Sequence, residues 1–259
     1  MSRVASVFKP GHKALIAYLT VGYPSREATG AAAAVLADSG CDIIELGIPF
    51  SDPLADGATI QRASYQALKG DITPRDCIEI AAKLRQEIAT PLVFMSYYNP
   101  ILSFGLEAFC QASARAGVDG LIVPDLPPDE GGELEVSARN HGLDLTYLLT
   151  PTSTEARISL VAEKSQGFIY LVSLTGVTGA RQTLPPELED FVRRVRRKTA
   201  KPLCVGFGVS NPDQAARVAQ VADGVIVGSR LLELITEDTS LASLKSAVLS
   251  LRQALNQHK

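Results

Sequence analysis

Short apolar runs alternate with amphipathic segments along the whole chain. The apolar runs cover residues 14–20, 41–46, 91–98, 120–125, 143–150, 167–173, 202–208 and 223–229. They are apolar at successive positions rather than at every second one, which is typical of parallel strands that helices cover on both faces. The pattern therefore predicts eight strands of one parallel sheet.

A helical pattern follows the strand-like runs. The expected helices cover residues 25–40, 73–88, 106–117, 129–142, 154–167, 186–199, 211–222 and 239–255, and a further one begins at Ala58. Several begin at Ser, Thr, Asp or Asn and end at Gly, as capped helices do. Eight βα units at a spacing of about 30 residues predict an α/β fold, a (β/α)₈ TIM barrel in which residues 1–259 form a single domain.

Composition narrows the classes of protein. The chain has a formal net charge of −3, so nucleic acid is not expected as the main partner, because binding phosphate backbones requires a basic face. No segment reaches the roughly 18 apolar residues of a membrane span, and the N-terminus lacks the pattern of a signal peptide. The four cysteines show no metal-binding or disulfide spacing, so we expect no metal site and a cytoplasmic protein.

The stretch ELGIPFSDPLADG, residues 45–57, follows the second apolar run. In such barrels the reacting groups lie at the C-terminal ends of strands, so polar residues there are candidates for chemistry. Glu45 shares a strand face with Ile43 and is expected to point into the barrel mouth, where burial would raise the pKa of its carboxyl and suit it to general acid and base catalysis. A glutamate paired with a buried lysine or with backbone amides is an equally good interpretation.

Three other acids lie in comparable positions. Asp56 precedes Gly57, so a turn or a helix N-cap explains it by itself better than catalysis does. Asp52 lies in a Ser-Asp-Pro turn, and Asp125 ends the fourth apolar run. The three histidines are poorly placed, and no Schiff-base lysine or nucleophile motif is evident, so carboxylates are expected to perform any proton transfer.

Glycine-rich loops follow the last three strands. They are GVTGA at 176–180, GFGVS at 206–210 and GSR at 228–230, and a short helix is expected to begin at Ser229. Backbone N–H groups at glycines and at a helix N-terminus bind anions, and barrel phosphate sites commonly follow strands seven and eight. The loops together predict a phosphate site, to which Arg181 could contribute. Aromatic residues near strand ends could line an apolar pocket beside it; they are Tyr18, Tyr97, Tyr170 and Phe207.

From about Val7 to Leu255, the order and spacing of five motifs resembles the tryptophan synthase alpha subunit family. The motifs are ELGIPFSDPLADGATIQ, PDLPPDE, YLVSLTGVTGAR, VGFGVSNPDQ and DGVIVGSRL. The resemblance implies a lyase that cleaves indole-3-glycerol phosphate to indole and glyceraldehyde 3-phosphate, with Glu45 and Asp56 as catalytic residues. It also implies a set of substrate-binding residues. These are Tyr18, Tyr97, Tyr170, Thr178, Gly179, Phe207, Gly208, Gly228 and Ser229.

The resemblance further implies a partner. Family members bind a pyridoxal-phosphate beta subunit in an alpha2beta2 heterotetramer and themselves need no cofactor; Pro49 and Asp52 match the loop at that interface. The sequence leaves two alternative functions open. One is a free-standing lyase that releases indole, and the other is a non-catalytic activating subunit.

Overall fold

The computed structural model of the protein describes residues 2–172, 187–206 and 208–257, and within them nine strands form one sheet. All neighbouring strands are parallel, in the order β5-β4-β3-β2-β1-β9-β8-β7-β6. The strands are β1 Ala14–Thr20, β2 Ile43–Gly47, β3 Leu92–Met95, β4 Gly120–Ile122, β5 Asp144–Thr146, β6 Leu148–Leu149, β7 Ile169–Val172, β8 Leu203–Gly206 and β9 Gly224–Val227.

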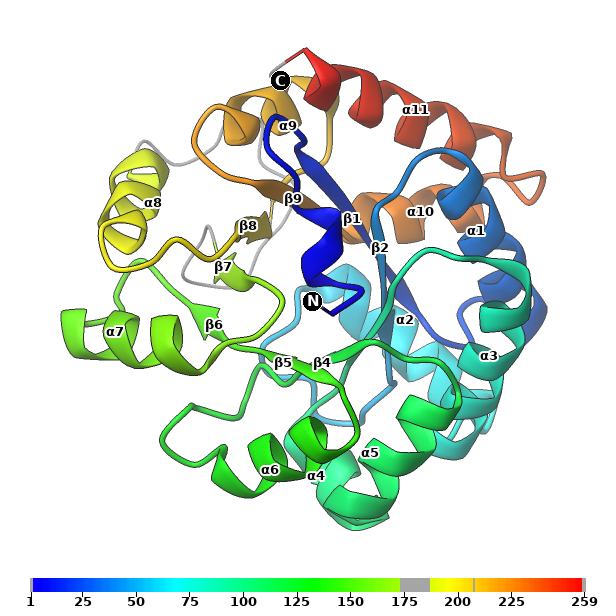
Figure 1. The fold of residues 1–259 in the computed structure, drawn as a ribbon. Helices are drawn as coiled ribbons and strands as arrows, with labels where there is room; N and C mark the ends of the chain where they lie inside the picture. Colours follow the sequence, from blue (N-terminus) through cyan, green and yellow to red (C-terminus); the bar gives the residue numbers. More distant parts are fainter. Residues whose placement is uncertain (1, 173–186, 207, 258–259) are drawn as a thin grey trace.

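Helices form a ring outside the strands, as Figure 1 shows. They are α1 Arg26–Asp38, α2 Ala58–Lys69, α3 Pro74–Glu87, α4 Tyr98–Phe104, α5 Leu106–Arg115, α6 Gly132–Asn140, α7 Glu155–Lys164, α8 Leu188–Arg196, α9 Pro212–Ala219, α10 Ser229–Glu237 and α11 Ala242–Asn256. This arrangement confirms the predicted TIM barrel. The expectation of a single domain over residues 1–259 stays a prediction.

The fifth predicted strand, 143–150, is divided into β5 and β6 at Tyr147. The N–H of Tyr147 donates to the Ser165 hydroxyl at 3.0 Å instead of to a neighbouring strand, and its carbonyl accepts from the N–H of Tyr170 at 3.1 Å. β5 pairs with β4 and β6 pairs with β7. The break at Tyr147 is therefore the point where the chain changes its pairing partner and the barrel is nearly closed.

Alternate strand residues face two separate cores. On β1, Ile16 and Tyr18 belong to the cluster inside the barrel, whereas Leu15, Ala17 and Leu19 pack in the cluster between strands and helices. Every residue of β1 is buried. Burial on both faces explains why the strands are continuously apolar in the sequence.

The N-terminal end of the barrel is closed by the 3₁₀ helix η1, Ala5–Val7, which lies across the centre of the strands in Figure 1. Val4 is fully buried in the interior cluster, and the rings of Phe8 and Phe168 lie 5.9 Å apart. This segment fills the N-terminal end of the barrel with apolar side chains. The opposite, C-terminal end is the one left for a cavity.

The third predicted strand, 91–98, was too long, because α4 begins within its range. The N–H of Tyr98 donates to the Asp125 carboxylate at 2.9 Å and so helps to start α4. Four other helices begin as the sequence predicted, with the side chains of Ser25, Thr73, Thr154 and Asn211 accepting from backbone N–H groups.

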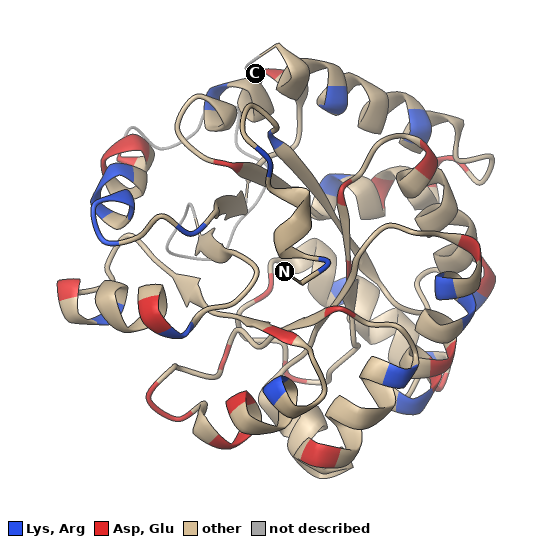
Figure 2. Cartoon of the chain, viewed as in Figure 1, with Lys and Arg blue, Asp and Glu red and all other residues tan. Residues whose placement is uncertain are grey.

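Charged side chains lie mainly on the outer helices and loops, as Figure 2 shows. On α8, for example, Arg193 pairs with Glu189 one turn away, and both side chains are exposed. All four cysteines are free and buried. Among the described residues, no helix combines the length and apolarity that crossing a membrane requires.

Candidate active site

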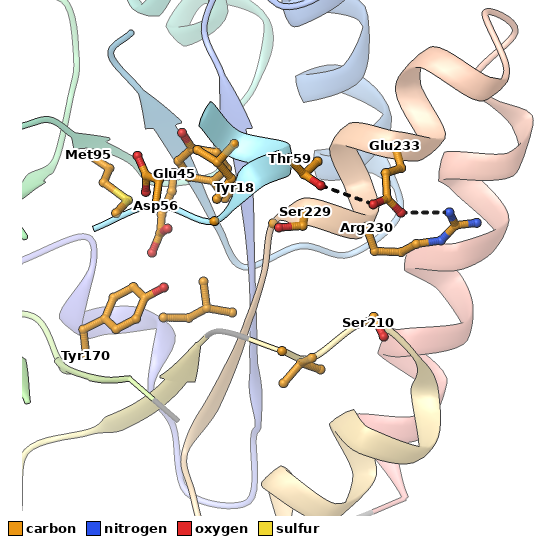
Figure 3. Close-up of a pocket in the computed structure, with 16 residues that line it drawn as sticks. Tyr18, Glu45, Asp56, Thr59, Met95, Tyr170, Ser210, Ser229, Arg230 and Glu233 are labelled. Carbon is orange, nitrogen blue, oxygen red and sulfur yellow. Dashed lines mark hydrogen bonds and ion pairs between the residues drawn. The ribbon is translucent and has the colours of Figure 1, made fainter. Parts of the chain in front are cut away.

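A cavity of about 340 Å³ opens at the C-terminal ends of the strands. Its walls come from β1, β2, β3, β7 and β9, from the segment before α2, and from the start of α10. Figure 3 shows Glu45, Asp56 and Tyr170 at one end and Ser229, Arg230 and Glu233 toward the other. The cavity lies where the barrel fold predicts the chemistry.

Glu45 lies on β2 inside this cavity and is fully buried. Neither of its carboxylate oxygens has a hydrogen-bond partner within the described part of the chain. Burial raises the pKa of the Glu45 carboxyl to about 8, because desolvation disfavours the charged form. Among the described residues, Glu45 therefore has neither the lysine nor the backbone amides of the alternative interpretation, and at neutral pH the group can hold and release a proton.

Asp56 reaches the cavity from the loop between β2 and α2. Gly57, not Asp56, is the N-cap of α2, so the carboxylate is not used as a cap. The chain turns back over the barrel through the bond from the Asp56 N–H to the Pro53 carbonyl at 3.0 Å, and the Gln61 side chain donates to the Asp56 carbonyl at 2.9 Å. Burial raises the pKa of Asp56 to about 6, and a hydrogen bond with Tyr97 opposes that rise.

Tyr18 and Tyr170 line the cavity from β1 and β7. Each hydroxyl lies over a glycine: a Cβ at Gly47 would come within 2.1 Å of the Tyr18 oxygen, and one at Gly206 within 2.3 Å of the Tyr170 oxygen. Burial raises the pKa of both phenols well above the ordinary value, so they remain neutral. Ile60, Met95 and Ile226 complete an apolar wall around them.

Tyr97 does not line the cavity among the described residues but lies behind the Asp56 segment. Its hydroxyl accepts from the Ala55 N–H at 2.9 Å, and its ring packs on Phe50 with centroids 5.2 Å apart. Tyr97 also forms the hydrogen bond that lowers the pKa of Asp56. The structure therefore connects Tyr97 to the site through the loop that carries Asp56.

The other end of the cavity is formed by Gly208, Ser210, Gly228 and Ser229. Gly208 has a φ of +91°, a conformation that glycine adopts readily. Gly228 is the N-cap of α10 without a side-chain cap, so the first N–H groups of that helix have no partner within the helix. Backbone donors and a helix N-terminus are groups that can bind an anion, and the phosphate site expected from the sequence stays a prediction.

The remaining predicted site residues lie elsewhere. Thr178, Gly179, Phe207 and Arg181 fall outside the described residues. Pro49 is buried after β2, whereas Asp52 is exposed in the loop, where the Ser51 hydroxyl donates to it. Asp125 is exposed and caps α4 rather than lining the cavity.

Sequence reasoning gave no role to several lining residues, among them Thr59 and Glu233, whereas Ser210 and Arg230 lie within the predicted loops GFGVS and GSR. Alternation along β9 could have indicated Ile226, since Gly224 and Ile226 share a face. No comparable signal marks Thr59 or Glu233. Their positions depend on how α10 packs beside α2.

Comparisons with known proteins agree with this geometry. The family model described as "Tryptophan synthase alpha chain" matches residues 4–258. The chain is 55% identical to the Dehalococcoides mccartyi tryptophan synthase alpha chain over 99% of its own length and 100% of that relative, and 52% identical to the Chloroflexus aurantiacus protein of the same name over 90% of each.

Solved structures give the same result. A chain of Mycobacterium tuberculosis tryptophan synthase is 41% identical with a TM-score of 0.92, covering 98% of each chain. The Legionella pneumophila tryptophan synthase alpha subunit is 36% identical with a TM-score of 0.91, covering 99% of each chain.

Proposed function

The chain belongs to the tryptophan synthase alpha chain family, whose members are lyases that cleave indole-3-glycerol phosphate in tryptophan biosynthesis, and we propose that it does so with Glu45 and Asp56 as catalytic residues. The observation that carries the proposal is Glu45, a fully buried carboxyl without a hydrogen-bond partner among the described residues, which faces the same cavity as Asp56. Such an arrangement is costly for folding and suits proton transfer.

The reaction breaks the bond between C3 of indole and the hydroxyl-bearing carbon of the glycerol chain. C3 must gain a proton, the hydroxyl must lose one, and positive charge develops toward the indole nitrogen before the bond breaks. Products are indole and glyceraldehyde 3-phosphate, with no change in overall oxidation state. Only proton transfers and charge stabilisation are needed, so two carboxyl groups are sufficient.

Glu45 fits the proton transfers. Its pKa of about 8 means that the protonated form predominates at pH 7, ready to donate to C3. Once ionised, the same carboxylate can accept the hydroxyl proton, which restores the starting state. Proton transfer by a positioned group typically contributes about 10²–10⁴-fold to the rate.

Asp56 is suited to stabilising the positive charge that develops at the indole nitrogen. With a pKa of about 6 it is mostly ionised at pH 7 and can accept a hydrogen bond from the indole N–H. That bond strengthens as the nitrogen becomes positive, so it stabilises the transition state more than the substrate.

The cavity suits the rest of the substrate. Tyr18, Tyr170 and the apolar side chains beside them would hold the flat indole ring, and Gly208, Gly228 and Ser229 would bind the phosphate at the other end. Thr178, Gly179 and Phe207 complete the substrate site in this proposal because their motifs match the family.

We also infer a beta subunit partner, in an alpha2beta2 heterotetramer that binds through the loop containing Pro49 and Asp52. Leu54 of this loop is 91% exposed, an unusual degree for a large apolar side chain and one that a partner could cover. Pyridoxal phosphate is expected only in that partner, since the proposed steps assign this chain no cofactor. The expected compartment is the cytoplasm.

An indole-release assay tests the proposal. Purified chain is given indole-3-glycerol phosphate while a tryptophan synthase beta subunit is titrated in. We expect indole and glyceraldehyde 3-phosphate in equal amounts, and turnover that rises with beta subunit. Full turnover without any response to beta subunit would favour a free-standing lyase, and no product in the complex would favour a non-catalytic subunit.

A further inference from the structure

The charges around the cavity are unbalanced for a site that binds phosphate. Among the described lining residues, three are acidic, Glu45, Asp56 and Glu233, and Arg230 alone is a permanent cation. Glu233 lies at the same end as Ser229, on the same helix (Figure 3). An unneutralised glutamate there would repel a phosphate group, so the charge of Arg230 is important for this end of the cavity.

Arg230 is the second residue of α10, directly after Ser229. Its Nη1 donates to Glu233 at 3.2 Å and to Glu237 at 3.1 Å. Both contacts are ion pairs, and the side chains of Arg230 and Glu233 are each 37% exposed. Pairs this exposed contribute little to stability, so a doubly charged ligand nearby can compete for the guanidinium.

We propose that Arg230 binds the phosphate of the substrate, and that Glu233 and Glu237 hold its guanidinium beside the cavity in the absence of substrate. In Figure 3 the guanidinium lies beside Glu233, on the side of Ser229 away from Glu45. A change of side-chain rotamer would turn it from the last turn of α10 toward the first. There it joins the backbone donors of Gly228 and Ser229 around one anion.

The chemistry favours arginine for this task. A guanidinium is charged at every physiological pH and offers paired N–H donors whose geometry matches two phosphate oxygens. Backbone N–H groups bind the anion but carry only partial charge. Among the described lining residues, Arg230 alone would therefore bring a whole positive charge to the substrate phosphate. This inference rests on the proposed function and adds a residue that determines specificity for the phosphorylated substrate.

The test compares Arg230→Gln with Arg139→Gln. Arg139 is an exposed cation on α6 that does not line the cavity, so it controls for a general loss of positive charge. Steady-state kinetics are measured with indole-3-glycerol phosphate and with indole-3-glycerol, which lacks the phosphate. Thermal melting checks that each variant is folded, and Arg230→Lys keeps the charge while losing the paired donors.

We expect Arg230→Gln to raise KM for the phosphorylated substrate by about 10- to 100-fold, the loss of a hydrogen-bonded charge, with kcat little changed. The kcat/KM for indole-3-glycerol should stay the same, so discrimination between the two substrates falls by the same factor. Arg230→Lys should be intermediate, and Arg139→Gln should match the wild type. An unchanged KM and unchanged discrimination in folded Arg230→Gln would overturn the inference while leaving the proposed function intact.

Binding of inorganic phosphate, measured by calorimetry, separates this inference from the proposed function. Weaker phosphate binding by Arg230→Gln supports the role of Arg230 even if the wild type forms no indole. Equal binding by both proteins contradicts that role, even if the wild type is an active lyase.

Discussion

Carboxylates at the two ends of this barrel have opposite surroundings. At the N-terminal end, Asp42, Asp119 and Asp223 each accept a backbone N–H from a neighbouring strand and pair with an arginine. At the C-terminal end, Glu45 and one oxygen of Asp56 have no partner in the described structure. The same type of group stabilises the fold at one end and remains available for chemistry at the other.

Asp119 is an example of a structural carboxylate at the N-terminal end of the barrel. It accepts from the Leu92 N–H at 2.9 Å and from Arg85 at 3.0 Å, and Arg3 adds a second ion pair at 3.0 Å. The carboxylate therefore joins the starts of β3 and β4 to α3 and the N-terminal segment. Glu45, by contrast, has no hydrogen-bond partner among the described residues, and its desolvation is a cost to folding that a role in proton transfer explains.

Replacing Glu45 should have the largest effect on catalysis. We expect Glu45→Gln to lower kcat for indole formation by about 10²–10⁴-fold, because the amide cannot transfer the proton. Binding of inorganic phosphate should be unchanged. Measurable turnover close to that of the wild type would exclude Glu45 as the proton donor.

Stability provides the control for this variant. The folded-state pKa of Glu45, about 8, lies above its ordinary value of 4.5, so between these values the folded chain holds a proton that the unfolded chain has released. The contribution of Glu45 to stability is therefore present at low pH and falls as pH rises toward 8, by up to about 1.4 kcal/mol per pH unit. Glu45→Gln should lack this decline, and urea unfolding at pH 5 and pH 8 would measure the difference.

Replacing Asp119 should have the opposite effect, lowering the stability of the fold and leaving catalysis intact. We expect Asp119→Ala to lower the free energy of unfolding by about 3 kcal/mol, because it removes the negative charge beside Arg85 and the acceptor of the Leu92 N–H. The folded fraction should keep its kcat. Asp129→Ala is the matched control: Asp129 pairs with Arg157 but is 56% exposed, so the loss should be below about 1 kcal/mol. A large fall in kcat for folded Asp119→Ala would contradict the division between the two ends.

Replacing Tyr97 should have the smallest effect on catalysis. Tyr97 forms a hydrogen bond with Asp56, so Asp56 is less isolated than Glu45. Removing the hydroxyl in Tyr97→Phe removes a bond that lowers the pKa of Asp56, so that pKa should rise. The acidic limb of the kcat/KM profile should move to higher pH by about 0.5–1 unit. Tyr65→Phe, an exposed tyrosine on α2, should leave the limb in place. An unmoved limb in Tyr97→Phe would mean that Tyr97 does not act on Asp56.

The sequence predicted the features that depend on periodicity and local chain direction. Continuous apolar runs identified the strands, and the alternation from Ile43 to Glu45 placed that carboxyl inside the barrel. Features set by distant contacts could not be predicted. The break at Tyr147 depends on the Ser165 hydroxyl, and the start of α4 depends on Asp125.

The same distinction applies to the candidate site. A helix cap and a catalytic acid were both reasonable for Asp56, and only the three-dimensional position of Gly57 as the N-cap excludes the first. Arg230 lies within the predicted phosphate loop GSR, but Glu233 could not be assigned to the cavity, because an exposed helix with ion pairs three residues apart has the same pattern anywhere on a protein surface. Its place follows from the packing of α10 beside α2.

The pH dependence of kcat/KM for indole-3-glycerol phosphate cleavage tests the central claim most directly, because it reports the ionisation of both Glu45 and Asp56 in the free enzyme. An ionised Asp56 and a protonated Glu45 predict a bell-shaped profile with an acidic limb near pH 6, an alkaline limb near pH 8 and a maximum between them. A profile that stays level from pH 5 to pH 9 would contradict the assignment of these two carboxyls as the catalytic pair.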